Sequence, residues 1–257
     1  MVSKACEKLY DLHNHLLFGV DDGAKDLDAC EAMLRDAAEN NIGLIAATSH
    51  ILPRTDMVKY EANFPKVVEL AAEYGIKVVR GGEYNARCFP ENPPYVTLGG
   101  SENGTVLLDF RLPTFPPEFQ QLVDNVFNCG NTLMIAHPER TFPESMLSEL
   151  ERLAECGVVY QVTAGSLLGK FGAPAKSFGW KLLRNNLAKI IASDAHDVDN
   201  RPSFLSDAFE AVAHKLGGDA AIALQENARR IIEEPGSQLE KIPVKRSIFS
   251  LFNWLGK

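Results

Sequence analysis

The chain has 257 residues, with 34 acidic side chains against 26 Lys and Arg, and a formal net charge of -8. Its 46% hydrophobic and 23% charged residues exclude a disordered chain, and the length is sufficient for one full-sized core. The acidic balance argues against a protein that binds nucleic acid through phosphate contacts, because such binding needs a basic surface.

Short apolar runs alternate with helical patterns along most of the chain. The runs predict strands at 9–12, 44–48, 76–79, 105–110, 132–136, 158–162 and 189–192. Apolar residues at helical spacing predict helices at 27–41, 58–74, 119–127, 147–154, 173–185 and 205–216, followed by short helical pieces to 234. Proline and glycine mark a loop-rich stretch at 85–104. This alternation predicts an α/β fold, either a closed barrel or a doubly wound sheet.

The last residues of the chain differ in charge from the rest. We predict a single domain over 1–236 and a basic tail over 237–257, in which four basic residues stand against one acidic residue. Ile248, Leu251, Phe252 and Leu255 recur in the tail at helical spacing. The pattern predicts a helix that packs on the barrel or on a second subunit, and contact with a membrane surface or a partner is the alternative.

The five cysteines are widely spaced and form no C-x-x-C pair, which argues against a disulfide framework or a zinc knuckle. No apolar run is long enough to span a bilayer, and the N-terminus lacks the pattern of a secretory signal. We therefore expect a cytoplasmic protein. No arginine lies six positions after any cysteine, so a phosphocysteine intermediate is not supported.

Most of the predicted strands are followed by a side chain of a type that binds metals. These residues are His13, His15, His50, Glu83, Asp109, His137, Asp194 and His196, and Asp22 lies in the first loop. The carboxyl ends of barrel strands meet at one face, so these distant residues can share a site. In a strand, residues i and i+2 point the same way, which lets His13 and His15 hold one cation. Imidazole and carboxylate ligands without thiolate suit Mn²⁺, Fe²⁺, Zn²⁺ or Mg²⁺.

Several short blocks carry a resemblance to a known family. In chain order they read DLHNH at 11–15, GVDDG at 19–23, TSH at 48–50, GE at 82–83, AHPER at 136–140, TAGSLLGKFG at 163–172 and ASDAH at 192–196. Together they resemble the polymerase and histidinol phosphatase (PHP) superfamily, and more narrowly its capsule-type bacterial protein-tyrosine phosphatases, over about residues 11–232. The H-x-H alone is weakly specific, whereas the later blocks together are strongly specific.

The resemblance implies a distorted (β/α)7 barrel with three divalent metal ions, usually Mn²⁺, at the carboxyl ends of the strands. By this resemblance, one ion is held by His13, His15, Glu83 and Asp194, a second by Glu83, Asp109 and His137, and a third by Asp22, His50 and His196. The family commonly has Glu where this chain has Asp109, which leaves the ligand distance or metal preference at that position open. His214 lies within a predicted helix, and we expect it to have no metal role.

The same resemblance implies hydrolysis of phosphotyrosine by a water that the metal ions activate. Arg140 and Arg201 are the candidate phosphate clamps, because a guanidinium meets phosphate with two parallel hydrogen bonds. Lys170, in a predicted loop at 165–172, is a weaker candidate. The implied substrate is a phosphotyrosine protein, the tail of a bacterial tyrosine kinase that controls capsule or exopolysaccharide export.

Three other functions remain open from the sequence. A related phosphatase for a small molecule such as histidinol phosphate fits the same chain length and metal ligands. A nuclease fits the superfamily but conflicts with the acidic composition, and we expect no nucleic-acid partner. An inactive binding module conflicts with the full set of ligand-type residues.

Overall fold

The computed structural model describes residues 8–244. The predicted amphipathic segment of the tail therefore lies outside the described residues. Within the described range, no helix is both long and apolar enough to cross a membrane.

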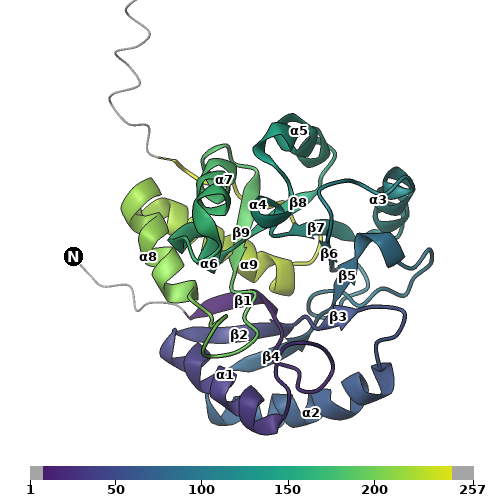
Figure 1. The fold of residues 1–257 in the computed structure, drawn as a ribbon, viewed down its shortest axis with the longest axis vertical. Coiled ribbons are helices and arrows are strands. Elements are labelled where there is room, and N and C mark those ends of the chain that lie inside the picture. The colour runs from purple at the N-terminus through teal and green to yellow at the C-terminus, as the bar shows by residue number, and fades with distance from the viewer. Residues whose placement is uncertain (1–7, 245–257) are drawn as a thin grey trace, which may run out of the picture.

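The strands are parallel to one another (Figure 1), and all but two of them follow the predicted runs closely; the short strands β3 and β5 were not predicted. They are β1 (Leu9–Asn14), β2 (Ile42–Ala47), β3 (His50–Ile51), β4 (Lys77–Arg80), β5 (Glu83–Asn85), β6 (Thr105–Asp109), β7 (Thr132–Ala136), β8 (Val159–Thr163) and β9 (Ala188–Ala192). Hydrogen bonding places them in the orders β1-β2-β4 and β3-β5-β6-β7-β8-β9.

These two sheets form one ring. β3 follows β2 after only two residues, and β5 follows β4 in the same way, so two staves of the barrel are each broken once. At the other junction, Asn14 bridges Ala195 in parallel, and the amide of Asp194 donates to the carbonyl of His13 at 2.8 Å. The ring reads β1, β2/β3, β4/β5, β6, β7, β8, β9 and back to β1. The expected distorted (β/α)7 barrel is confirmed, and the doubly wound sheet is excluded.

Helices surround the ring on the outside (Figure 1). Within the described residues they are α1 (Leu27–Glu39), α2 (Met57–Glu73), α3 (Phe119–Asn128), α4 (Pro138–Thr141), α5 (Leu147–Glu155), α6 (Ala164–Leu168), α7 (Gly172–Arg184), α8 (Leu205–Leu216) and α9 (Gly218–Glu233), with 3-10 turns at Ala86–Cys88 and Glu144–Met146. Two predictions were wrong in detail. The stretch 165–172 is partly the helix α6 rather than a loop, and the expected short pieces before 234 are the single helix α9.

Local chemistry explains where the first helices begin. Asp26 accepts a hydrogen bond from the amide of Ala29 at the start of α1, as its position before the helix predicts. Asp56 caps α2 in the same way through the amide of Lys59. Both carboxylates satisfy a backbone donor that the helix itself leaves free, which fixes the point where the chain turns into the helix.

The lower half of the barrel interior is apolar. A buried cluster there includes Leu12, Leu44, Leu107, Met134 and Ile190, contributed by strands all around the ring. Ala228 and Ile231 of α9 join this cluster, so α9 covers the end of the barrel opposite the carboxyl ends of the strands. The polar side chains that follow these residues therefore stand on a closely packed base.

Two segments without regular structure also pack on the barrel. In the loop-rich stretch, the rings of Tyr84, Phe89 and Tyr95 contact one another in series, and this stretch takes the place of a helix after β5. At the other end of the chain, Ile242 is buried and exchanges hydrogen bonds with the side chain of Asn186. The first residues after 236 thus lie on the barrel, while the division at 236 stays a prediction.

Candidate metal centre

All the predicted ligands lie at the carboxyl ends of the strands and in the loops that follow them. Most of them line a cleft of about 230 Å³, and His13 and His15 lie fully buried next to it. The lining residues are Asp22, His50, Glu83, Asp109, Arg111, His137, Arg140, Asp194, His196 and Arg201. The fold therefore brings together every ligand-type residue that the sequence indicated, together with both predicted arginines.

The first cluster consists of the two histidines of β1 and a carboxylate after β9. The Nε2 atoms of His13 and His15 lie 3.1 Å apart. Asp194 Oδ1 lies 3.4 Å from Nε2 of His13 and 3.5 Å from Nε2 of His15. Both imidazoles and the carboxylate are almost completely buried. Their nitrogen and oxygen atoms lie close enough together to hold one metal ion.

The second cluster is centred on Glu83. Its Oε1 lies 3.1 Å from Nε2 of His137 and 3.4 Å from Nε2 of His13, and these three residues form a group able to hold an ion. Asp109 is the outermost member, with Oδ1 at 3.9 Å from Nε2 of His137. Its short side chain leaves it farther away than the other ligands. For Asp109, the property that decides ligation is therefore the distance from its carboxylate to a metal ion in the second cluster.

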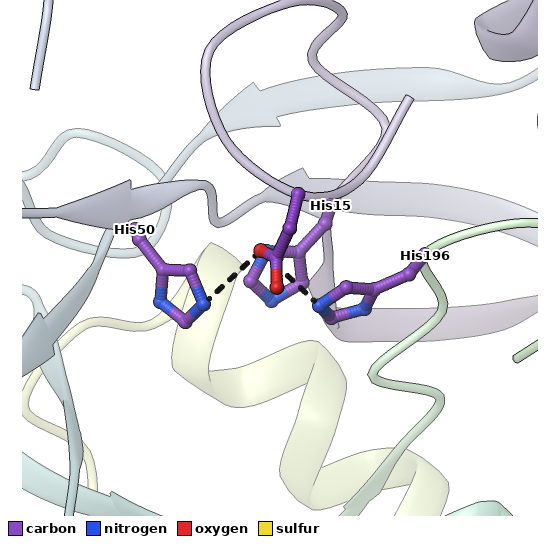
Figure 2. Close-up of side chains that lie close together, drawn as sticks. His15, His50 and His196 are labelled. Carbon is purple, nitrogen blue, oxygen red and sulfur yellow. Dashed lines mark ion pairs between the residues drawn. The ribbon is translucent and has the colours of Figure 1, made fainter. Parts of the chain in front are cut away.

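The third cluster lies toward the mouth of the cleft, where the rings of His15, His50 and His196 converge (Figure 2). Asp22 Oδ1 lies 3.4 Å from Nε2 of His50 and 3.7 Å from Nε2 of His196. The carboxylate of Asp22 is 67% exposed, in contrast to the buried ligands of the other clusters. This cluster is the one most open to solvent and substrate.

Three of the histidines have their second ring nitrogen fixed by a partner. His13 Nδ1 bonds the amide oxygen of Gln161 at 3.0 Å, and His15 Nδ1 bonds Asp21 at 2.8 Å. His196 Nδ1 bonds the backbone carbonyl of Asp194 at 3.1 Å. Because each partner is an acceptor, each Nδ1 carries a hydrogen, and Nε2 is the ring nitrogen that faces the cleft and becomes a metal ligand once it is free of its proton. Metal-ligating histidines have this arrangement.

Gln161 and Asp21 belong to the site although the sequence did not indicate them. Asp21 lies beside Asp22 in the first loop, and it also accepts from the backbone amides of His50 and Gly23. Gln161 is a polar residue in an otherwise apolar strand, and this was the one signal that could have identified it. Arg111 is a third residue that the sequence did not indicate. It follows β6 on a loop, and its Nε lies 3.8 Å from Oδ2 of Asp109.

The electrostatics of the centre favour a cation. Burial alone would lower the pKa of His15, but hydrogen bonds with Asp194 and Asp21 raise it to about 10. Burial would likewise raise the pKa of Asp194, yet the charges of His13 and Arg140 hold it well below its ordinary value. The field of the buried carboxylates is thus strong enough to raise the pKa of His13 and His15 despite burial, whereas burial and the charge of His15 lower the pKa of His196 to about 4. The same field, together with the two Nε2 atoms that face each other at 3.1 Å, suits divalent cations in that space.

The backbone at the centre departs from ordinary geometry at two ligands. His137 has φ of 34° and Asp194 has φ of 54°, in the left-handed region that side chains other than glycine rarely adopt. Ser193, which precedes Asp194, is held by Asp11 through its backbone amide at 2.8 Å and through its hydroxyl. This buried network joins β1 to the end of β9 and compensates for the strain at Asp194.

The two predicted clamp residues share one carboxylate oxygen. The guanidinium groups of Arg140 and Arg201 both bond Oδ2 of Asp194, the second of them at 2.7 Å. The Nε atom of each arginine is buried and has no hydrogen-bond partner among the described residues. Asp194 therefore faces the histidines with one oxygen and orients both arginines with the other. Lys170 is exposed and does not line the cleft, since its Nζ lies over the ring of Phe204.

Comparison with known proteins identifies the family. Residues 9–233 match the sequence profile described as "Capsular polysaccharide synthesis, CpsB/CapC". The chain belongs to the CpsB/CapC family. The tyrosine-protein phosphatase YwqE of Bacillus subtilis (strain 168) is a relative with 30% identity over 246 residues, which cover 87% of this chain and 91% of YwqE.

Solved structures agree with this assignment. A chain from a study of YwqE from Bacillus subtilis and CpsB from Streptococcus pneumoniae, described there as unique metal-dependent tyrosine phosphatases, matches with a TM-score of 0.79 and 26% identity. The match covers 93% of this chain and 99% of that one. An amidohydrolase from Mycoplasma synoviae matches with a TM-score of 0.54 and 13% identity, over 97% of this chain and 94% of that one, which shows likeness of fold alone.

Proposed function

We propose that this CpsB/CapC family member is a metal-dependent phosphatase that hydrolyses phosphotyrosine in proteins. The observation that carries the proposal is that one carboxylate connects a candidate metal cluster to the two candidate phosphate clamps. Asp194 belongs to a cluster able to hold a metal ion through Oδ1 and bonds both Arg140 and Arg201 through Oδ2. The named relatives are tyrosine phosphatases, which supports phosphotyrosine as the substrate rather than another phosphate ester.

Three divalent ions are proposed for the centre, with Mn²⁺ as the first choice over Fe²⁺, Zn²⁺ or Mg²⁺. The three clusters described above would hold one ion each, with Glu83 shared between the first and the second and Asp109 joining the second. His15 lies within reach of both the first and the third cluster. The Nε2 atoms of His13, His15 and His196 that face the cleft, and the mixture of imidazole and carboxylate, support this choice of metals.

When bound, divalent ions supply an activated water and neutralise charge on the phosphate. The chain's own residues bind and orient the substrate. Arg140 and Arg201 bind the phosphate oxygens, and their shared contact with Asp194 keeps both guanidinium groups at one side of the cleft. The leaving group is a phenolate with a pKa of about 10, so it needs less help from a general acid than an alkoxide does. The cleft carboxylates alone would repel phosphate, so metal loss should weaken binding as well as rate.

The proposed physiological substrate is the tyrosine-rich tail of a bacterial tyrosine kinase of capsule or exopolysaccharide synthesis. The family's description as a capsular polysaccharide synthesis family supports this partner. We further propose that the protein acts in the cytoplasm, where the ATP needed for tyrosine phosphorylation is present.

A substrate panel tests the proposal. The purified full chain, first treated with EDTA and then loaded with Mn²⁺, is compared on a phosphotyrosine peptide, histidinol phosphate and single-stranded DNA. We expect hydrolysis of the phosphotyrosine peptide with Mn²⁺ and loss of it with EDTA. Preference for histidinol phosphate or DNA would contradict the substrate, and phosphotyrosine hydrolysis that persists in EDTA would contradict the metal dependence. Metal analysis of the loaded protein gives the number of ions.

A further inference from the structure

Two phenylalanine rings border the arginine side of the cleft. Phe171 precedes α7 and is 37% exposed, and Phe204 precedes α8 and is partly buried. Both line a hollow of about 40 Å³ that shares Asp194 and Arg201 with the metal cleft. Apart from the histidines, these two are the aromatic side chains that the described residues contribute to the lining of the cleft and the hollow.

The ring of Phe171 is held in place from two sides. The guanidinium carbon of Arg140 lies 4.5 Å from the ring centroid, which is the distance of a cation–π contact. On another side the ring lies against Gly165, where a β-carbon would come within 3.0 Å of Cε2. The ring is thus packed against a candidate phosphate clamp, while more than a third of the residue stays exposed. An apolar ring held rigid and left partly exposed beside a cleft is suited to contact a ligand.

The chemistry of the substrate places its own ring in the same region. In phosphotyrosine, a single ester oxygen separates the phosphorus from the phenyl ring. A phosphate bound by Arg140 therefore holds its phenyl ring within reach of the side chains around that guanidinium, and Phe171 is one of them. Aromatic rings attract each other in offset or edge-to-face arrangements at centroid distances of about 4.5–7 Å. Phosphoserine and phosphothreonine have no ring to place there.

We propose that Phe171 is a specificity-determining residue that packs against the phenyl ring of phosphotyrosine and so favours aryl over alkyl phosphates. This inference rests on the proposed phosphotyrosine function. Phe204 lines the same hollow, but its ring contacts Lys170 rather than a candidate phosphate clamp. The competing explanation is that Phe171 only orients Arg140. In that case its loss should affect aryl and alkyl phosphates equally.

Two phosphonates that cannot be hydrolysed separate these explanations. Binding of phenylphosphonate and methylphosphonate to the Mn²⁺-loaded full chain is measured by calorimetry for the wild type, Phe171→Leu and Phe171→Tyr. Leucine keeps an apolar side chain without a ring, and tyrosine restores the ring. We expect Phe171→Leu to lose about 3- to 10-fold in affinity for phenylphosphonate, with methylphosphonate unchanged and Phe171→Tyr close to the wild type.

The chain provides a matched control. Phe64 on α2 has the guanidinium carbon of Arg80 at 4.6 Å from its ring centroid, nearly the same contact as that of Phe171, and it is not among the residues that line the cleft. Phe64→Leu should leave the affinity for both phosphonates unchanged. A second variant, Gly165→Ala, displaces the ring of Phe171 without removing it. It should reduce phenylphosphonate affinity in the same direction but by less.

The outcomes are distinct. Equal losses for both phosphonates in Phe171→Leu, or no loss for either, would overturn the inference. Hydrolysis of phosphotyrosine and phosphoserine peptides is then measured with the same variants, and the selectivity ratio should fall in Phe171→Leu. If the wild type hydrolyses neither peptide but the phosphonate pattern holds, the proposed function fails, whereas the assignment of Phe171 as an aryl contact survives.

Discussion

The two halves of the barrel interior are built from the same strands but have opposite chemistry. On β1, Leu12 belongs to the buried apolar cluster, and its neighbour His13 belongs to the metal centre. On β7, Met134 is apolar and buried, while His137 lies just beyond the strand end. The lower half obtains its order from close packing and from α9. The upper half contains buried imidazoles and carboxylates that pair with one another and whose nitrogen and oxygen atoms lie close enough to hold metal ions. The lower half therefore stabilises the fold, and the upper half provides the candidate metal ligands.

The largest expected effect comes from removing the Asp194 carboxylate, which takes part both in the proposed metal binding and in the orientation of the two arginines. Asp194→Ala deletes a ligand-type oxygen and the partner of both arginines at once. We expect phosphotyrosine hydrolysis to fall at least about 1,000-fold, because metal binding and phosphate orientation are lost together. The far-UV circular dichroism spectrum should stay unchanged, since the apolar half of the barrel is untouched. An Asp194→Ala variant with wild-type activity would contradict the assignment of the site.

The opposite effect is expected from the lower half. Leu44→Ala removes a buried side chain from the apolar cluster and leaves every ligand in place. The free energy of unfolding should fall by about 2–5 kcal/mol, measured by urea denaturation of the metal-free protein. Activity per folded molecule at 25 °C should be close to that of the wild type. If activity fell as steeply as in Asp194→Ala, the two halves would not be separable.

An intermediate effect is expected from the residues that orient the histidines. Asp21→Asn weakens the bond that fixes His15 Nδ1, and Gln161→Leu removes the acceptor of His13 Nδ1. Each change should reduce Mn²⁺ affinity or activity about 10- to 100-fold, as the loss of an outer partner of a metal ligand usually does. Asp56→Asn, which alters the cap of α2 at a residue that lines neither the cleft nor the hollow, is the matched control and should leave both unchanged.

A graded effect is expected from the pH dependence of metal affinity. In the metal-free protein the pKa of His15 is raised to about 10, so at neutral pH this imidazole carries a proton that a metal ion has to displace. Mn²⁺ binding should release protons. For each proton displaced, the affinity for Mn²⁺ should fall about tenfold for each unit by which the pH is lowered. Calorimetry in two buffers with different ionisation enthalpies measures the release. A Mn²⁺ affinity independent of pH between 6 and 8 would contradict this picture.

The same raised pKa gives a stability prediction of definite sign. A group whose pKa is higher in the folded state contributes stability below its unfolded pKa of about 6.5, and this contribution is lost as the pH rises through the folded value. The metal-free protein should therefore lose this contribution of His15 between about pH 6.5 and 10. Urea denaturation in EDTA across this range measures the loss, and Mn²⁺ should remove the trend by taking the place of the proton.

The sequence by itself determined most of the elements and the identities of the ligand-type residues. Apolar runs located the strands within a few residues, because a strand buried on both faces has to be apolar along its length. Histidines and acids at the ends of those runs were visible for the opposite reason, since polar side chains interrupt the pattern. The family blocks added the barrel and the grouping of the ligands. Residues 165–172 were misassigned because their glycines indicated a loop, although a short helix is compatible with them.

Only the tertiary structure decided how these residues meet. The breaks between β2 and β3 and between β4 and β5 place His50 and Glu83 in the cleft, and no local pattern shows that each pair of short strands forms one stave. The bond of Gln161 to His13 and that of Arg140 to Asp194 are contacts between segments distant in sequence. Asp21 and Arg201 lie close to their partners along the chain, and the shape of the loops decides those two bonds. The place of Phe171 against Arg140 is decided in the same way. The sequence records which side chains are available, whereas closure of the barrel sets the distances between them.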